Sequence, residues 1–382
     1  MNKKSIAIFY PYFDKKGGIG GEAITVWVID ALKKEYNINL FTCRKVRAVN
    51  FNNAYGTTIS DGDFKIVNPL PVFLLNAIIP KLGMLKYHCI IRYFKMSYKK
   101  FDILMGLYKE IDFGERGIQY IHFPELKYKK NELNFFSRLY HKNYFINRIY
   151  KSLCYFISGF NEERAKKNIT MTNSYWTKNM VKKIMGLDSI VVYPPVLDDF
   201  KSIPWRKKDN DFICIGRISP EKRIKIVIEI LKLVRDNGFD ISLHIIGPVY
   251  SYFYYRKIKA LQARNQWIIF EGIVSRKKFT DIISQHRYGI HGKKDEHFGI
   301  VIAEMIKAGC IVFVPNDGGQ IEIVNNEELI YSNVTEAAQK IIKILKDKEK
   351  QEEVLQNLKI SAKRFSTAIF KKSIQEVIRN FS

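Results

Sequence analysis

Short apolar runs along the chain alternate with stretches whose apolar residues recur at helical spacing. Residues 6–10 (IAIFY) form a run typical of a buried strand, and residues 37–42 (NINLFT) form another. Between them, one helical face carries apolar side chains at Ile24, Trp27, Val28, Ala31 and Leu32. The order strand, helix, strand predicts a βαβ unit and therefore a parallel sheet.

The same alternation restarts near residue 211. Strands are expected at 212–215, 241–246 and 311–314, and a helix at 301–308. Ser219 and Pro220 are N-terminal helix signals and Gly238 is a stop signal, so a helix is expected between them, with two more helices in the tail. The pattern therefore predicts an α/β protein with a second sheet.

Length agrees with two domains, since 382 residues exceed one ordinary domain. The proline-containing, polar stretch 194–211 is the predicted boundary. We expect an N-terminal Rossmann-like domain over 1–197 and a C-terminal one over 198–365. Residues 366–382 are a last helix that we expect to pack back on the N-terminal domain.

The composition is that of a soluble globular protein, with 47% hydrophobic and 26% charged residues, which excludes intrinsic disorder. Five scattered cysteines without C-x-x-C spacing argue against a disulfide framework or a zinc site and fit a reducing cytoplasm. The net charge of +25 is unusual. It suits nucleic acid, an anionic membrane or a nucleotide, and composition does not choose among these partners.

Part of this charge is concentrated beside aromatic residues. Residues 64–101 contain seven Lys/Arg and no acid, and residues 133–161 are again free of acids while carrying nine aromatics. Interfacial helices combine basic and bulky apolar faces, so we expect segments 72–100 and 133–160 to dock on anionic lipid. The alternative is that these aromatics belong to the N-domain core.

Two features of the N-terminal half are candidates for ligand contact. The loop GGIGG, which includes Gly17 and Gly18, precedes a helix, where backbone N–H groups and the helix dipole attract anions. His122 ends a predicted strand in YIHFP. An unliganded turn and a structural histidine are the respective alternatives.

The segment GRISPEK, residues 216–222, is a more specific signal. A glycine at a strand end followed by a helix start brings Arg217 and Lys222 to one anion-binding point beside Gly216. A solvated first helical turn is the alternative.

A pair of glutamates follows in EHFGIVIAE, where Glu296 and Glu304 are separated by seven residues. With Glu296 in a loop and Glu304 in a helix, both border one cleft at different depths and suit hydroxyl groups of a sugar nucleotide. The helix N-terminus at Gly299-Ile300 would meet the phosphates between them. A capping acid and a surface glutamate are the alternative.

Together these motifs resemble the retaining nucleotide-sugar glycosyltransferases of family four, which have the GT-B fold of two Rossmann-like domains with parallel sheets facing a central cleft. YIHFP, NSYWT and YPPV resemble in particular the α-1,2-mannosyltransferases of lipid-linked oligosaccharide and their bacterial relatives. The resemblance spans nearly the whole chain, with GRISPEK and the paired glutamates as its most specific parts. Its motifs are GGIGGE, YIHFP, TNSYWT, VYPPV, GRISPEK, EHFGIVIAE and the Gly318-Gly319 pair.

The resemblance implies transfer of a hexose from a nucleotide diphosphate, with GDP-mannose favoured and UDP-sugars open, to a glycan or lipid-linked glycan. Arg217 and Lys222 would hold the diphosphate, and Glu304 the ribose. Glu296, His297, Phe298, Gly299 and His122 would contact the transferred sugar. Gly17 and Gly18 would contact the phosphates or the acceptor, and Gly272 and Ile273 the base. No cofactor or metal is expected, and the implied place is the cytoplasmic face of a membrane.

Two other functions remain open from the residues alone. A nucleic-acid-binding protein is favoured only by net charge, and we expect no nucleic-acid partner. An NADP-dependent oxidoreductase would use Gly18 and Gly20 with Arg44 on the 2′-phosphate. An oxidoreductase function would give no role to GRISPEK or to the paired glutamates.

Overall fold

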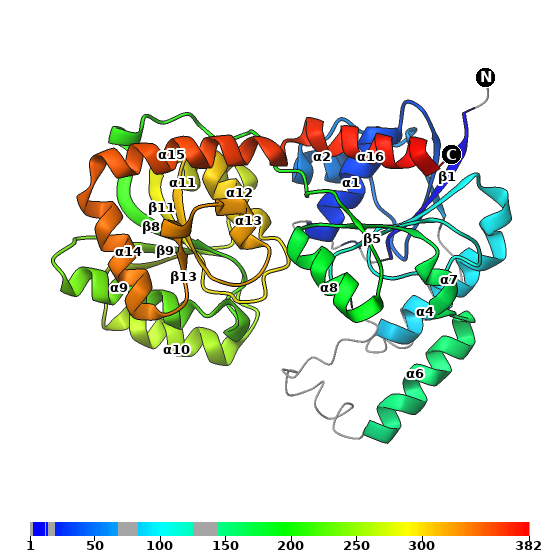
Figure 1. Cartoon of the computed structure of the whole chain (residues 1–382), viewed down its shortest axis with the longest axis horizontal. Coiled ribbons are helices and arrows are strands. Elements are labelled where there is room, and N and C mark those ends of the chain that lie inside the picture. The colour runs from blue at the N-terminus through cyan, green and yellow to red at the C-terminus, as the bar shows by residue number, and fades with distance from the viewer. Residues whose placement is uncertain (1–2, 12, 14–19, 68–82, 125–143, 382) are drawn as a thin grey trace. The chain divides into compact units, whose positions relative to one another are not determined.

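The computed structural model describes residues 3–11, 13, 20–67, 83–124 and 144–381 (Figure 1). The chain divides into two compact units, Met1–Pro195 with Phe370–Ser382, and Val196–Ile369. Sequence analysis placed the divisions at 197/198 and 365/366. We call the first the N-terminal unit and the second the C-terminal unit.

The N-terminal unit is built on a seven-stranded sheet with the order β3-β2-β1-β4-β5-β6-β7, in which every pairing is parallel. Helices connect most of the strands. The strands are β1 (Ser5–Phe9), β2 (Asn37–Phe41), β3 (Phe64–Val67), β4 (Ile103–Gly106), β5 (Ile118–Ile121), β6 (Ile169–Thr172) and β7 (Ile190–Val191). The helices are α1 (Gly20–Leu32), α2 (Ala48–Tyr55), α4 (Gly83–Ser97), α6 (Tyr144–Ser158), α7 (Glu162–Lys166) and α8 (Tyr175–Met185).

The C-terminal unit has a six-stranded parallel sheet with the order β10-β9-β8-β11-β12-β13. Helices α9 and α14 pack together, and α12 and α13 pack on α15. The strands are β8 (Asp209–Ile215), β9 (Leu243–Ile246), β10 (Ile268–Gly272), β11 (His286–Ile290), β12 (Ile311–Pro315) and β13 (Ile330–Tyr331). The helices are α9 (Ile224–Asp236), α10 (Tyr252–Ala263), α11 (Arg276–Gln285), α12 (Ile300–Lys307), α13 (Gln320–Val324), α14 (Val334–Lys346) and α15 (Lys348–Ala362).

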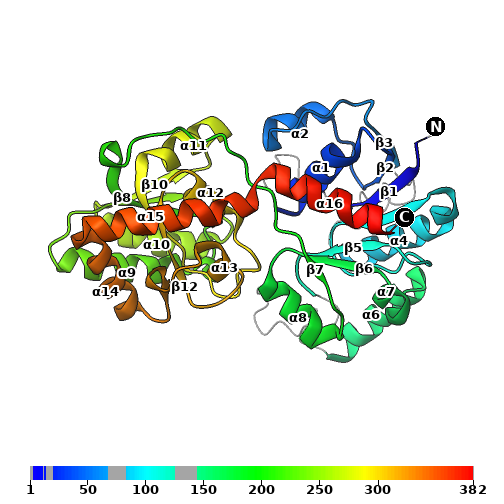
Figure 2. The same cartoon turned by 45° about the horizontal axis from the view of Figure 1, so that its top comes forward.

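The last helix, α16 (Thr367–Phe381), follows α15 and lies beside α1 in both views of the chain (Figures 1 and 2). Gln375 donates a hydrogen bond to the carbonyl of Ala31, and Lys371 pairs with the buried carboxylate of Asp30. The apolar face of α16 is buried through Phe370, Ile374, Val377 and Ile378. The final helix therefore belongs to the N-terminal unit from Phe370 onward.

The expected alternation of strands and helices is found in both units, but two predictions about individual helices were wrong. The tail contains three helices, α14, α15 and α16, where two were expected. The helix expected to begin at Ser219 begins at Ile224 instead. Pro220–Lys222 form a separate 3-10 turn, and Arg223 follows in the left-handed region with φ of 51°. A residue in that conformation interrupts the helical path, so the turn and α9 cannot merge.

Candidate active site

The carboxyl edge of the C-terminal sheet has a switch point between β8 and β11. The chain continues from β8 to β9 on one side of β8, whereas β11 lies on its other side. In open α/β sheets, the loops that leave such neighbouring strands in opposite directions flank a crevice in which ligands bind. Gly216 follows β8 and His291 follows β11, so these two positions mark the place where a ligand site is expected.

Backbone packing at this edge requires glycine. A Cβ added at Gly247 would lie 2.0 Å from the carbonyl oxygen of Gly216, and both glycines have positive φ, 146° and 148°. A Cβ at Gly216 would also lie 3.2 Å from Cε of Lys222. The aliphatic stem of Lys222 therefore runs across the strand end, which is where the GRISPEK motif was expected to place it.

Lys222 meets Glu296 at the switch point. Its Nζ lies 2.8 Å from Oε2 of Glu296, and both side chains are about 85% shielded from solvent. His291 Nε2 lies 3.3 Å from the same oxygen. Burial alone would raise the pKa of Glu296, but the hydrogen bond from His291 and the charge of Lys222 outweigh it and hold that pKa well below its ordinary value. Glu296 is therefore an ionised carboxylate in a nearly dry place.

The Gly318-Gly319 pair fixes the backbone of Glu296. Gly319 N–H donates to the carbonyl of Glu296 at 2.7 Å. Gly318 has φ of 84°, and a Cβ there would lie 2.4 Å from the Glu296 carbonyl oxygen. In the sequence this pair was identified only as a motif of the family resemblance. Its contact with Glu296 crosses about twenty residues of chain and has no local signal.

Arg217 does not join Lys222 at Glu296. Its Nη2 pairs with Oε1 of Glu221 at 2.7 Å, and its guanidinium lies 4.9 Å from the ring centroid of Tyr250. Half of its side chain is exposed. The structure thus places the two basic residues of GRISPEK beside different carboxylates, and sequence analysis did not identify Tyr250.

The loop Glu296–Gly299 leads directly into α12. Gly299 precedes the helix with φ of 106°, and Ile300 is its first residue. Phe298 is buried and meets the ring of Phe365 edge-on at 5.4 Å, whereas His297 is half-buried. As expected, Glu296 lies in the loop and Glu304 in the helix. Phe298 therefore anchors the loop in the core of the unit, while the backbone around it is the part that a ligand can meet.

Glu304 is buried and paired with Arg276, a residue that sequence analysis missed. Burial raises the pKa of Glu304, and the charge of Arg276 only partly offsets this. Arg276 begins α11 and also pairs with Asp199 at 2.8 Å. The three residues lie far apart in sequence, so no spacing pattern connects them.

Gly272 and Ile273 leave the outer strand β10 at the same edge of the sheet. Gly247 N–H donates to the carbonyl of Gly272 at 2.9 Å, which ties this loop to the strand end next to β8. Gly272 has φ of 68° with nothing within 4 Å of an added Cβ, and the Ile273 side chain is 71% exposed. The backbone here is open, as the expected contact with a base requires.

In the N-terminal unit, His122 follows β5 and lies next to the start of α1. A Cβ added at Gly21 would lie 3.3 Å from His122 Nε2 and 3.0 Å from the hydroxyl of Tyr10. His122 Nε2 is also 3.2 Å from the carbonyl of Leu107, which follows β4. Burial and nearby Glu22 raise the pKa of Tyr10. Gly21, the last glycine of GGIGG, is therefore a neighbour of His122. Gly17 and Gly18 lie outside the described residues.

Within the described ranges, no group of three or more His, Cys, Asp or Glu side chains is arranged to hold a metal ion. Lys222, Glu296, Arg276 and Glu304 at the C-terminal carboxyl edge form ion pairs with one another.

Comparisons with known proteins agree with this geometry. The profile of the family described as "Glycosyl transferases group 1" matches residues 196–360, a range that contains both GRISPEK and the paired glutamates. Residues 196–360 are therefore similar to a group 1 glycosyltransferase domain. This confirms the expected enzyme class, a hexosyltransferase.

Several curated relatives carry the name GDP-Man:Man(3)GlcNAc(2)-PP-Dol alpha-1,2-mannosyltransferase. The protein of Dictyostelium discoideum is 26% identical over 282 residues, which cover 67% of this chain but only 53% of the relative. The protein of Homo sapiens is 23% identical over 427 residues, which cover 97% and 85% of the two chains. The chain thus spans about half of one relative and most of the other.

Solved structures share the fold over nearly the whole of this chain. Anabaena HepE, in complex with UDP and glucose, superposes with a TM-score of 0.68 at 14% identity over 98% of this chain and 99% of that one. WaaG, a glycosyltransferase involved in lipopolysaccharide biosynthesis, superposes with a TM-score of 0.67 at 14% identity, over 97% and 98%. The GT-B fold class is confirmed.

Proposed function

We propose that this glycosyltransferase moves a hexose from a nucleoside diphosphate sugar to a hydroxyl of a glycan or lipid-linked glycan, with retention of anomeric configuration. The observation that carries the proposal is the Lys222–Glu296 pair at the switch point of the C-terminal sheet, beside the N-terminus of α12. A cation and a helix dipole suit a diphosphate, and an ionised buried carboxylate accepts hydrogen bonds from sugar hydroxyls.

In this proposal the ammonium group of Lys222 leaves Glu296 and binds the diphosphate when the donor enters the site. Lys222 and Arg217 neutralise the charge that develops on the leaving nucleotide, and the backbone of Gly299 and Ile300 adds N–H groups and the helix dipole. Glu296, with the backbone of His297, Phe298 and Gly299, then holds the sugar hydroxyls. Glu304 binds the ribose, and the open backbone at Gly272-Ile273 meets the base. We propose that these groups stabilise the diphosphate and that no metal or cofactor takes part.

GDP-mannose is the favoured donor, because the curated relatives named above are GDP-mannose-dependent by their names. UDP-sugars remain candidates, since HepE binds UDP and glucose. His122 and the glycine loop of the N-terminal unit are proposed to contact the transferred sugar, the phosphates or the acceptor. The imidazole and phenol at that position can both donate and accept hydrogen bonds, which suits hydroxyl groups.

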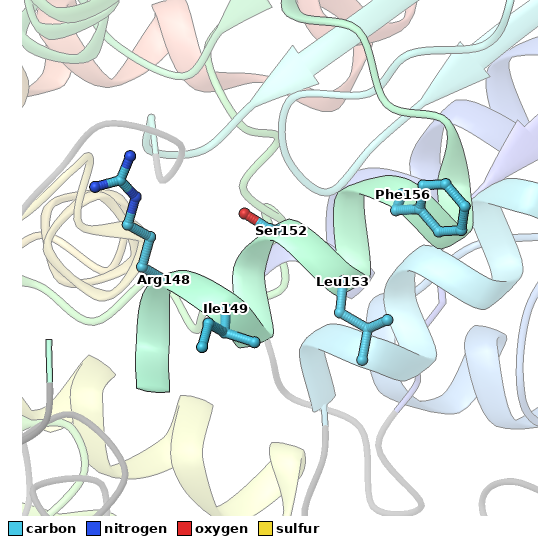
Figure 3. Close-up of a pocket in the computed structure, with 5 residues that line it drawn as sticks. All are labelled: Arg148, Ile149, Ser152, Leu153 and Phe156. Carbon is cyan, nitrogen blue, oxygen red and sulfur yellow. The ribbon is translucent and has the colours of Figure 1, made fainter. Parts of the chain in front are cut away.

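We also propose that the N-terminal unit docks on anionic lipid at the cytoplasmic face of a membrane. Helix α6 carries Ile149, Leu153 and Phe156 at spacings that place them on one face, and all three are at least half exposed. With Arg148 and Ser152 they line an open hollow of about 470 Å³ (Figure 3). Neither α6 nor α4 contains an acidic residue, so the surface complements anionic headgroups.

The structure narrows this membrane surface relative to the sequence prediction. Tyr155 and Phe160 stack on each other and meet the ring of His88 edge-on, and the hydroxyl of Tyr150 accepts a hydrogen bond from Leu85 N–H. These aromatics pack within the unit, in agreement with the alternative that they belong to the N-domain core. Only the outer face of α6 is proposed to meet lipid; residues 72–82 and 133–143 of the predicted segments lie outside the described residues. No described helix is long and apolar enough to cross a bilayer.

A vesicle co-sedimentation series tests the membrane proposal. Binding to phosphatidylserine vesicles should exceed binding to neutral vesicles and fall with salt. Phe156→Asp should weaken it at least tenfold, because burying a phenylalanine contributes roughly 1.5–3 kcal/mol. Phe253→Asp, at a side chain of nearly equal exposure in the C-terminal unit, is the control. Equal, salt-insensitive binding to both vesicle types would sink the proposal.

An assay of the full chain with labelled GDP-mannose, UDP-glucose and UDP-N-acetylglucosamine tests the enzymatic proposal. A polyprenyl-diphosphate oligosaccharide serves as acceptor, and NMR of the product reads the anomeric configuration. The expected result is donor-dependent transfer with retained configuration. Inversion, or transfer from no nucleotide sugar, would contradict the proposal.

A further inference from the structure

Arg276 joins two carboxylates at the carboxyl edge of the C-terminal sheet. Its Nε and Nη2 donate to the two oxygens of Asp199 at 2.9 and 2.8 Å, in the bidentate geometry that a guanidinium favours. Its Nη1 donates to Oε1 of Glu304. One planar group therefore connects the first residues of the unit to the helix that carries the second glutamate.

The Arg276 guanidinium lies over two aromatic rings. The ring centroids of Phe200 and Phe279 lie 5.4 and 5.1 Å from it. A cation within about 6 Å of an aromatic face is attracted to it, and Arg stacks on rings more readily than Lys does. Bidentate pairing and two rings leave the Arg276 side chain one well-defined orientation.

Glu304 needs such a partner because it is buried. A carboxylate removed from water is disfavoured in its charged form unless a cation or hydrogen-bond donors compensate it. A protonated Glu304 would use one oxygen as a donor, and an unanchored one would sample several rotamers. Ribose hydroxyls, which donate hydrogen bonds, need a carboxylate that is both ionised and fixed.

We propose that Arg276 is a positioning residue that fixes Glu304 for the ribose of the donor, and that Asp199 fixes Arg276 in turn. This inference rests on the function proposed above. It assigns the preference for a ribonucleotide to a three-residue chain of contacts, Asp199–Arg276–Glu304, and not to Glu304 alone. Arg276 touches neither ribose nor phosphate in this arrangement.

The inference predicts how well the enzyme distinguishes ribose from deoxyribose. A charged hydrogen bond to a hydroxyl that the analogue lacks should change affinity roughly tenfold. Wild type should therefore bind GDP or UDP about tenfold more tightly than the corresponding 2′-deoxynucleoside diphosphate. Arg276→Gln should reduce this ratio to about threefold or less, mainly by weakening the ribonucleotide.

Isothermal titration calorimetry of the full-length chain with both pairs of nucleotides is the test. Arg276→Lys keeps the charge but loses the fork, so it should show a ratio between those of wild type and Arg276→Gln, and Asp199→Asn should act in the same direction. Arg235→Gln is the matched control, since Arg235, on helix α9, also pairs with an aspartate, Asp240, and lies over the ring of Trp267. It should retain the wild-type ratio.

Two results would overturn the inference in different ways. If Glu304→Gln loses the preference for ribose while folded Arg276→Gln and Arg276→Lys keep it, Arg276 does not position Glu304 and the proposed function stands. If wild type binds no nucleoside diphosphate, the proposed function fails and the inference fails with it.

Discussion

The two sheets share a strand order but differ at their carboxyl edges. In each unit the first strand lies between its successor and a strand that enters later, β1 between β2 and β4, and β8 between β9 and β11. The C-terminal edge carries ion pairs, among them Lys222 with Glu296. Around Tyr10, Gly21 and His122 the N-terminal edge presents a phenol, backbone and an imidazole.

The difference separates two kinds of information. Strand order determines where a crevice forms, because loops from adjacent strands diverge there. The residues in those loops determine which ligand the crevice suits. Paired charges at the C-terminal edge suit a diphosphate and sugar hydroxyls, whereas the phenol and imidazole at the N-terminal edge suit a partner with hydroxyl groups. Substitutions at the charged edge should therefore affect turnover most, and those in the N-terminal unit should affect stability.

The largest effect is expected from Lys222→Ala. It removes the cation proposed for the leaving diphosphate, and loss of one such electrostatic contact costs about 10²–10³ in turnover. Lys225→Ala is the control, since Lys225 is exposed and pairs only weakly with Glu229 on α9. Steady-state kinetics compares the two. Turnover of Lys222→Ala close to that of Lys225→Ala would refute the assignment.

Gly318→Ala should have the next largest effect. The new Cβ would clash with the Glu296 backbone and displace the loop that carries this residue. A displacement of about 1 Å in a catalytic site can lower the rate roughly a hundredfold, so we expect a loss of roughly 10- to 100-fold in kcat. Gly238→Ala is the matched control, with φ of 91° and open space around its Cβ. It should cost about 1–2 kcal/mol of stability from backbone strain and leave kcat unchanged. Equal kcat in both variants would contradict the role of Gly318.

The N-terminal unit should respond to pH through His88. Burial, with help from Lys109 and Lys95, lowers its pKa from 6.5 to about 4. Between pH 6.5 and 4 the unfolded chain therefore binds a proton at His88 that the folded unit does not bind. The contribution of His88 to stability is constant above pH 6.5 and falls by about 2–3 kcal/mol down to pH 4. Urea unfolding of wild type and His88→Gln at pH 7, 5.5 and 4 checks this. A parallel pH dependence of both proteins would exclude His88 as the cause.

The smallest effect is expected from Lys371→Ala in α16. Lys371 pairs with Asp30 and lies 4.9 Å from the ring centroid of Trp27, but Asp30 keeps Lys33 as a second partner at 2.9 Å. We expect a loss of about 1 kcal/mol in the free energy of unfolding. Lys372→Ala, next along the helix and 77% exposed, should change it by less than about 0.5 kcal/mol. Similar losses in the two variants would show that the pair contributes nothing measurable.

Much of the fold follows from local pattern. Alternating apolar runs and helical stripes predicted both parallel sheets, since β-strand and helix periods are properties of neighbouring residues. The predicted start of α9 was wrong because Arg223 takes a left-handed conformation, which an arginine in the sequence does not indicate. Ser219, a typical cap residue, makes no side-chain cap there.

The candidate site was predicted in part. Lys222, Glu296 and Glu304 stand in motifs that a family resemblance supplies, and the loop and helix positions of the two glutamates followed from spacing. The contacts of Gly318 with Glu296, and of Arg276 with Glu304, could not be predicted. They join segments that only the folded sheet brings together, and neither residue type nor spacing marks them.

Hydrogen exchange of the full-length chain with and without GDP or UDP tests the central claim most directly, because it locates the ligand along the chain. The proposed site predicts slower exchange of backbone amides in residues 216–223 and 296–304 when the nucleotide binds, and no such slowing in Lys222→Ala. Unchanged exchange in both segments at a saturating nucleotide concentration, with protection elsewhere in the chain, would contradict the assignment of this edge as the donor site.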